Sequence, residues 1–143
     1  MDMREFRATT SIDAPLEQVW SVLANVERWS EWTASIKHIE PLTSPPFRIG
    51  SRFRVDQPKL PSAVWEVTVF EPQRRFIWQN KRAGVTVVAD HVLQDSGHGC
   101  AVTLTVHFAG VLGGLAGWLS RRLTEEYLVL ESEGLKARAE GRR

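Results

Sequence analysis

SIDAPLEQVWSVLANVERWSEW, which runs from Ser11 to Trp32, contains the clearest local indications of how this chain folds. It follows a predicted strand over residues 6–12, and the chain turns through an Asp-Ala-Pro sequence into an amphipathic pattern. The apolar positions have the i, i+3, i+4, i+7 spacing of a helix and are Leu16, Val19, Trp20 and Leu23. Proline suits a first helical turn, so a helix is expected to begin at Pro15. The VERWSEW sequence after Asn25 predicts a second, short helix with two tryptophans on one side.

Residues 36–108 carry a different pattern, in which apolar and polar side chains alternate with a period of two. Turn-forming residues divide this part of the chain into six predicted strands, with breaks at 41–46, 58–61, 71–73, 81–84 and 95–99. Each strand has one apolar and one polar face. Such alternation is typical of an antiparallel sheet that is covered on one side only.

The C-terminal segment is predicted to cover the apolar face of this sheet. Steps of three and four residues separate its apolar positions, which are Leu112, Leu115, Leu119, Leu123, Tyr127 and Leu130. Charged residues take the other side, namely Arg121, Arg122, Glu125, Glu126 and Glu131. One long amphipathic helix is expected. Its apolar start, 111–119, is far shorter than the roughly 20 residues that span a bilayer, so we expect a buried helix start and not a membrane anchor.

The composition is that of one domain covering residues 1–143, with 43% hydrophobic and 24% charged residues. A formal net charge of +1 gives no overall field that attracts nucleic acid or an anionic membrane. The only cysteine, Cys100, excludes an internal disulfide and a multi-cysteine zinc site. The N-terminus has no apolar stretch typical of a signal peptide, so a cytoplasmic location is expected. Motifs for metals, nucleotides and nucleophilic serines are absent, and we expect no metal or cofactor.

Four further strings follow in order along the chain: PPFRIGSRFRV at 45–55, VWEVTVFEPQRRFIWQ at 64–79, DHVLQDSGHGCAVTLTV at 90–106 and GLK at 134–136. With the stretch at 11–32, they resemble the SRPBCC superfamily of START-like, helix-grip proteins, and in particular its polyketide cyclase/dehydrase-like branch. The resemblance implies an α+β fold in which a seven-stranded antiparallel sheet wraps around the long C-terminal helix, in the order β-α-α-β6-α. It also implies an internal hydrophobic cavity for lipids, polyketides or other small hydrophobic molecules. No single reaction is implied, because members include cyclases, hydrolases, transfer proteins and binders.

Aromatic residues are the main candidates for the wall of such a cavity. Four of the six tryptophans lie outside the long helical segments, and a tryptophan usually borders a cavity or an interface. The predicted ligand-binding set is Trp29, Trp32, Phe53, Val55, Trp65, Val67, Phe76, Trp78, His91, Leu104, Leu123 and Tyr127. The alternative for any single ring is that it fills the core.

His91 and Tyr127 are the candidate catalytic residues. His91 alternates in phase with apolar neighbours and therefore points inward, where it could act as an acid, a base or a hydrogen-bond partner. A structural histidine is the alternative, and the adjacent Asp90 points to the opposite face, which makes it a poor orienting partner. Tyr127 could reach a ligand carbonyl with its phenol, or pack in the core with its hydroxyl at the edge.

Binding of a small hydrophobic or aromatic molecule, lipid- or polyketide-like, is the first functional hypothesis. The alternative is a polyketide cyclase/dehydratase-type enzyme that uses the same cavity. Inward polar side chains discriminate between the two, and only Gln57, His91 and Tyr127 are predicted to point inward, which favours binding. A protein-interaction module using the outer face of the sheet is a third possibility, supported only by exposed Arg and Thr residues. We expect a monomer or homodimer with no nucleic-acid partner and no membrane span.

Overall fold

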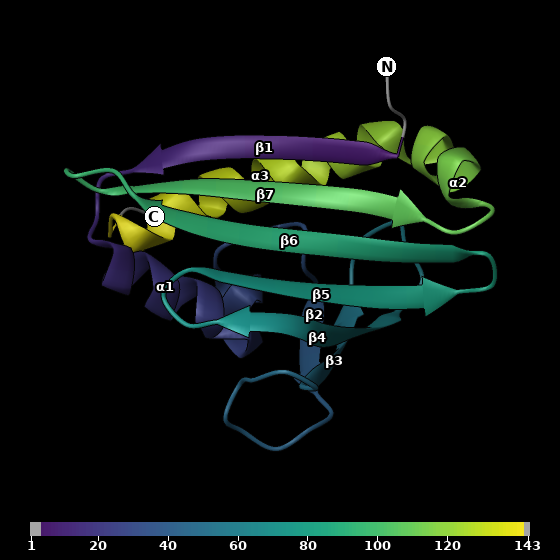
Figure 1. Ribbon diagram of the computed structural model, residues 1–143, viewed down its shortest axis with the longest axis horizontal. Coiled ribbons are helices and arrows are strands. Elements are labelled where there is room, and N and C mark those ends of the chain that lie inside the picture. Colours follow the sequence, from purple (N-terminus) through teal and green to yellow (C-terminus); the bar gives the residue numbers. More distant parts are fainter. Residues whose placement is uncertain (1–3, 142–143) are drawn as a thin grey trace.

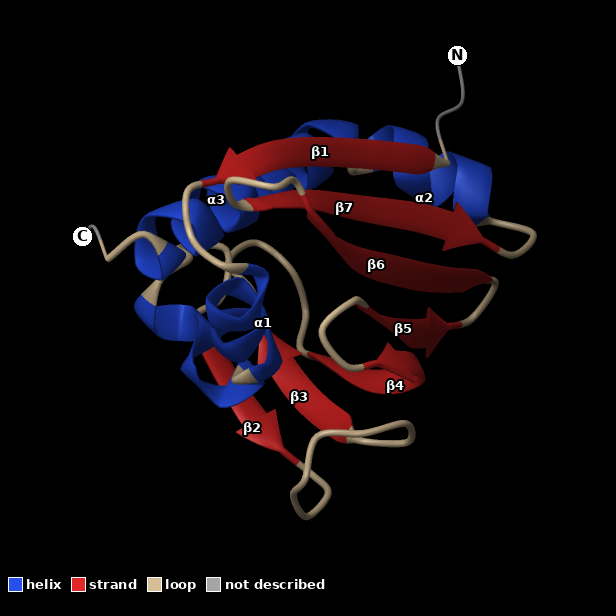
Figure 2. Ribbon diagram, turned by 60° about the vertical axis from the view of Figure 1, so that its left-hand side comes forward, coloured by secondary structure: helices blue, strands red, loops and turns tan. Residues whose placement is uncertain are grey.

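The computed structural model describes residues 4–141, and it contains one seven-stranded antiparallel sheet in the order β1-β7-β6-β5-β4-β3-β2 (Figure 1). The strands are β1 (Glu5–Ile12), β2 (His38–Pro41), β3 (Arg52–Asp56), β4 (Ala63–Glu71), β5 (Arg75–Arg82), β6 (Val85–Asp95) and β7 (Cys100–Ala109). Figure 2 shows that the sheet curves from β1 and β7 round to β3 and β2, so that it partly encloses the helices. The predicted fold class is confirmed.

The helices lie on the concave side of the sheet. They are α1 (Leu16–Ala24), the 3-10 helix η1 (Val26–Glu31), α2 (Gly113–Leu119) and α3 (Arg121–Ala139). Helix α1 buries Val19, Trp20 and Leu23, as its spacing predicts. No helix within residues 4–141 is both long enough and apolar enough to cross a membrane.

The C-terminal segment is broken at Ser120, so the prediction of one continuous helix from Leu112 onward is wrong at this position. The Ser120 hydroxyl donates a hydrogen bond to the Ala116 carbonyl at 2.7 Å, and Arg121 donates to the Trp118 carbonyl, also at 2.7 Å. The Ala116 carbonyl also accepts from the Ser120 backbone N–H at 3.0 Å, and a serine hydroxyl that shares such a carbonyl often bends a helix. The Trp118 carbonyl, at the end of α2, is satisfied by the Arg121 side chain. The 19-residue α3 is the long helix that the sheet surrounds.

The break also changes which side chains are buried. The apolar start of the segment is exposed, with exposed fractions of 49% for Leu112, 56% for Leu115 and 66% for Leu119. The expectation of a buried helix start is therefore wrong. Helix α3 instead buries Tyr127, Leu128, Ser132, Leu135 and Ala139. The spacing of the apolar residues before Ser120 therefore does not predict which side of α3 is buried, because a new helix begins after this residue.

Two contacts fix η1 between α1 and α3. The Trp29 indole, which is fully buried, donates to the Leu23 carbonyl at the end of α1 at 2.9 Å. On the other side, Gly134 of α3 lies against the backbone of Trp32, and a Cβ atom at Gly134 would overlap the Trp32 carbonyl oxygen. Only glycine permits this close approach of α3 to the residue that follows η1.

Candidate functional site

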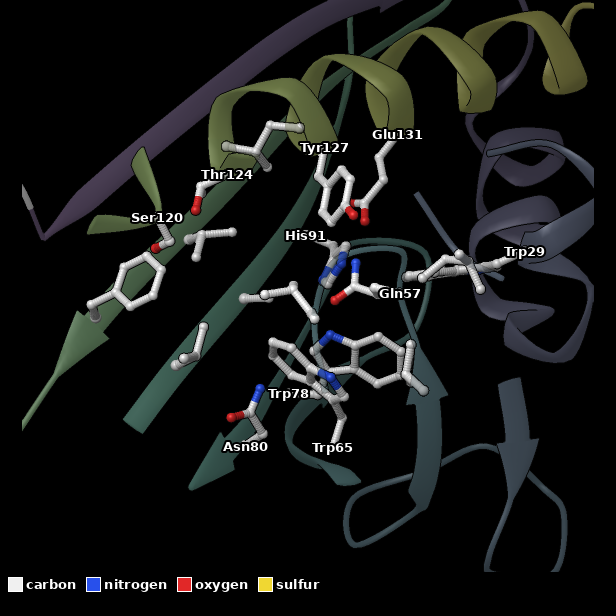
Figure 3. A pocket seen from close by; sticks show the side chains of 18 of the residues that line it. Trp29, Gln57, Trp65, Trp78, Asn80, His91, Ser120, Thr124, Tyr127 and Glu131 are labelled. Atoms are coloured by element: carbon white, nitrogen blue, oxygen red, sulfur yellow. The ribbon is translucent and has the colours of Figure 1, made fainter. Parts of the chain in front are cut away.

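A cavity of about 290 Å³ lies between α3 and the concave face of the sheet (Figure 3). Helix α3 supplies one wall, strands β3 to β7 supply the opposite one, and η1 and the loop after β3 complete the lining. The lining residues are Trp29, Ile36, Val55, Gln57, Leu60, Pro61, Trp65, Trp78, Asn80, Arg82, Val87, Ala89, His91, Val106, Phe108, Ser120, Thr124, Tyr127, Leu128 and Glu131. Most of these side chains are apolar, so the cavity suits a mainly apolar molecule.

Three tryptophans form a continuous aromatic wall. The ring centroids of Trp65 and Trp78 are 5.5 Å apart at an interplanar angle of 35°, and those of Trp29 and Trp78 are 5.2 Å apart. These distances lie in the range of favourable aromatic pairing. Each ring therefore packs in the core and also presents a surface to the cavity.

The structure brings together half of the predicted ligand-binding set. The residues at the cavity are Trp29, Val55, Trp65, Trp78, His91 and Tyr127. The remaining residues do not line it: Trp32, Phe53, Val67, Phe76, Leu104 and Leu123. Four of these are buried behind the wall, because a strand face that is wholly apolar extends beyond the stretch that borders the cavity. Trp32 packs against Trp29 instead, with ring centroids 5.6 Å apart.

His91 is buried with a fixed orientation. It lies directly opposite Phe76 in the register of β5 and β6, and the two rings stack with centroids 4.0 Å apart and planes 9° apart. Nδ1 is 3.2 Å from the Phe76 carbonyl oxygen. A carbonyl can only accept, so Nδ1 carries the hydrogen and Nε2 is left as an acceptor. Burial lowers the pKa of His91 to about 4, so the ring is neutral at physiological pH.

Asp90, the neighbour of His91 in the sequence, serves the other face of the sheet. Its carboxylate accepts two hydrogen bonds from Arg75, at 3.0 and 2.8 Å. The prediction that Asp90 does not orient His91 agrees with this pairing. Within residues 4–141, no group of three or more His, Cys, Asp or Glu side chains is placed to hold a metal ion.

Glu131 is the most important site residue that the sequence did not predict. It was expected on the outer side of the C-terminal helix, and this is wrong, because its carboxyl group lines the cavity one turn beyond Tyr127. Burial raises the pKa of Glu131 to about 7, although the Ser35 hydroxyl donates to Oε1 at 3.2 Å and opposes the shift. A carboxyl group that titrates near neutral pH can both donate and accept a proton.

Asn80 is a second unpredicted residue of the site. Its side chain is 7% exposed, it lines the cavity, and Oδ1 has no hydrogen-bond partner within the described residues. A buried amide oxygen without a partner lowers the stability of the protein unless a ligand or water satisfies it. Ser120, Thr124 and Glu131 also reach the cavity, so the expectation of only three inward polar residues is wrong.

Tyr127 and Arg82 hold a loop over one end of the cavity. The Tyr127 hydroxyl donates to the Pro58 carbonyl, and Arg82 donates to the Ser62 carbonyl at 2.8 Å. Both contacts fix residues 57–62, of which Leu60 and the following proline are exposed lining residues. The mouth of the cavity is therefore at this loop. The only hydroxyl proton of Tyr127 is used by the loop and not offered to a ligand.

An antiparallel sheet that curves round a C-terminal helix over an apolar cavity defines the helix-grip class of hydrophobic-ligand-binding folds. The family model described as "Polyketide cyclase / dehydrase and lipid transport" matches residues 3–140, and the chain belongs to this family. A search of curated proteins found no match.

Solved structures share this fold at low sequence identity. The di-domain aromatase/cyclase StfQ of the steffimycin biosynthetic pathway is 10% identical with a TM-score of 0.77, over 96% of this chain, which spans only 50% of that chain. The ZhuI aromatase/cyclase from a Streptomyces species is 18% identical with a TM-score of 0.76, over 96% of this chain and 93% of its own. A Thermus thermophilus protein is 22% identical with a TM-score of 0.75, over 94% and 96%. At these identities the likeness is one of fold.

Proposed function

We propose that the cavity binds a small, flat, mainly apolar molecule of about two fused rings that carries a hydroxyl group. The observation that carries the proposal is a cavity of about 290 Å³ with three tryptophan rings in its wall. This volume is about twice the ~150 Å³ of an apolar cavity that holds benzene. A two-ring molecule fits such a space, whereas a long acyl chain does not.

The polar groups that line the cavity indicate which polar substituent of the ligand would be favoured. Nε2 of the neutral His91 ring is an acceptor, because Nδ1 donates to the Phe76 carbonyl. An acceptor in an apolar wall favours a ligand that presents a donor, such as a phenolic hydroxyl. The unpaired Oδ1 atom of Asn80 gives a second place for a hydrogen-bond donor of the ligand.

Binding of 2-naphthol, naphthalene and palmitate, measured by calorimetry and by quenching of tryptophan fluorescence, tests this proposal. We expect 2-naphthol to bind with a dissociation constant on the order of 10 µM. The His91→Phe variant keeps the ring stack but lacks the acceptor, and it should bind 2-naphthol about tenfold more weakly and naphthalene unchanged. His107→Phe, a change on the partly exposed outer face, is the matched control. Binding of palmitate alone, or of no compound, contradicts the proposal.

A proton-transfer enzyme of the cyclase/dehydratase type is a second candidate, and Glu131 is the observation that favours it. With a pKa raised to about 7, its carboxylate could take a proton from a carbon next to a ligand carbonyl and its acid form could return one. Turnover of a poly-carbonyl substrate should then follow a pH profile with a midpoint near this value. Glu131→Gln should abolish turnover while ligand affinity is retained. Unchanged turnover in this variant rules out the candidate.

A further inference from the structure

Six of the ten large apolar side chains that are exposed within residues 4–141 gather at one end of the protein. Helix α2 and the turn between β5 and β6 lie together there, on the right-hand side of Figure 1, and the Leu112 amide donates to the Gly84 carbonyl at 2.8 Å. Loop 57–62 is bound to the same end through Arg82. Among the large hydrophobic side chains that are exposed in residues 4–141, six belong to this end: Leu60 (41%), Val111 (89%), Leu112 (49%), Leu115 (56%), Trp118 (46%) and Leu119 (66%).

The same end is strongly basic. We define the docking end as residues 57–62, 79–87 and 109–124, which contain five Lys or Arg residues and no Asp or Glu. The cations are Lys59, Lys81, Arg82, Arg121 and Arg122. The rest of the chain contains the other thirteen Lys and Arg residues and all seventeen Asp and Glu residues, so its formal charge is −4. The overall charge of +1 hides this separation.

The cations of the docking end are not used for ion pairs. None of the eight ion pairs among the described residues includes one of the five. Arg121 instead donates to the Trp118 carbonyl and lies over the Trp118 ring, with its guanidinium carbon 4.8 Å from the ring centroid. The apolar and basic side chains thus form one continuous surface.

We propose that the docking end binds the surface of a bilayer that contains anionic lipids. Apolar side chains with a tryptophan among them, next to Lys and Arg, are the composition that lies in a membrane interface. Each Lys or Arg close to an anionic surface adds to the attraction. A second copy of the chain is less well matched, because a two-fold contact would bring the five cations of one copy against those of the other.

This surface borders the mouth of the cavity. Ser120, which ends α2, and Leu60 and Arg82 across the mouth are all lining residues. A molecule that leaves the apolar part of a bilayer could enter the cavity here with little exposure to water. The docking proposal itself does not depend on which ligand the cavity holds, and the two can fail separately.

Co-sedimentation with lipid vesicles tests the docking proposal. The full chain should bind vesicles of phosphatidylcholine with phosphatidylglycerol, bind pure phosphatidylcholine vesicles much less, and lose most of its binding when salt is raised from about 0.1 M to about 1 M. The variant Leu115→Ser/Leu119→Ser should reduce the partition coefficient at least tenfold. Val129→Ser, at a side chain of α3 that is 48% exposed, is the control and should have no effect.

Two pairs of charge-reversal substitutions distinguish attraction at the docking end from an effect of the net charge of the whole protein. Lys81→Glu/Arg122→Glu should abolish binding, whereas Lys37→Glu/Arg48→Glu makes the same change in net charge at exposed positions outside the docking end and should retain most of it. The proposal is overturned if the chain binds no anionic vesicle or if both pairs have the same effect. It is also overturned if sedimentation velocity shows a dimer that Leu115→Ser/Leu119→Ser dissociates, since the surface is then an interface between copies.

Discussion

The perturbed carboxyl group of Glu131 predicts a specific dependence of stability on pH. In the unfolded chain the pKa of Glu131 is 4.5, and in the folded protein burial raises it to about 7. The folded state therefore holds the proton more tightly, and folding becomes less favourable as pH rises through the interval between the two values. Below this interval the group is protonated in both states and has no effect. Above it, the full shift corresponds to about 3 kcal/mol of lost stability.

The substitution Glu131→Gln removes the charge and keeps an oxygen that can accept from the Ser35 hydroxyl. We expect the variant to be more stable than the parent at high pH, and the difference between the two to grow by about 2 to 3 kcal/mol from about pH 5 to about pH 8. Urea unfolding followed by far-UV circular dichroism at both pH values measures this difference. Glu125→Gln, at an exposed position of the same helix, is the control. Parallel pH dependences of parent and Glu131→Gln would refute the reasoning.

Three further predictions follow from packing and hydrogen bonding. Gly134→Ala should lower the free energy of unfolding by about 1 to 3 kcal/mol in urea titrations, because the new methyl group overlaps a backbone carbonyl oxygen; Gly114→Ala, whose Cβ meets nothing closer than 3.5 Å, should not be destabilising. The imidazole of His91 should titrate by NMR near its lowered pKa of about 4, with stability lost as pH falls from 6.5 toward that value, and a midpoint near 6.5 would contradict its burial. Tyr127→Phe should cost about 1 kcal/mol and make loop 57–62 more sensitive to proteolysis, since the hydrogen bond to Pro58 is lost; an unchanged cleavage rate would show that other contacts hold the loop.

The strands and the first helix could be predicted because local patterns determine them. A period of two marks one buried face on each strand, and the turn residues between strands are visible in the sequence. The face of His91 was predicted correctly for this reason. The exact stretch of each face that borders the cavity depends on the curvature of the sheet, and so Val67 and Phe76 lie behind the wall although they share faces with Trp65 and Trp78.

The C-terminal segment could be predicted less well, for two separate reasons. The break at Ser120 is not visible in the spacing of the apolar residues, because the serine bonds its own side chain to the preceding turn. Glu131 lies four residues after Tyr127 and so shares its face of α3, but a carboxyl group is not expected among apolar side chains, and its charge assigned it to the outer side. Asn80 could have been found, since it continues the alternation of Phe76 and Trp78 on β5. It was missed because an amide in phase with aromatic residues is not expected on an apolar face.

The break at Ser120 has a consequence for how the chain can be changed. Helix α2 is held against the sheet through the bond from Leu112 to Gly84 and through Arg4, whose guanidinium group lies against Gly113 and donates to the Phe108 carbonyl at 3.1 Å. The α3 side chains that line the cavity, from Thr124 to Glu131, all follow the break. The two helices are thus separate modules within one segment. The outer surface of α2 can be redesigned without altering the cavity, and the cavity wall of α3 can be redesigned without altering that surface.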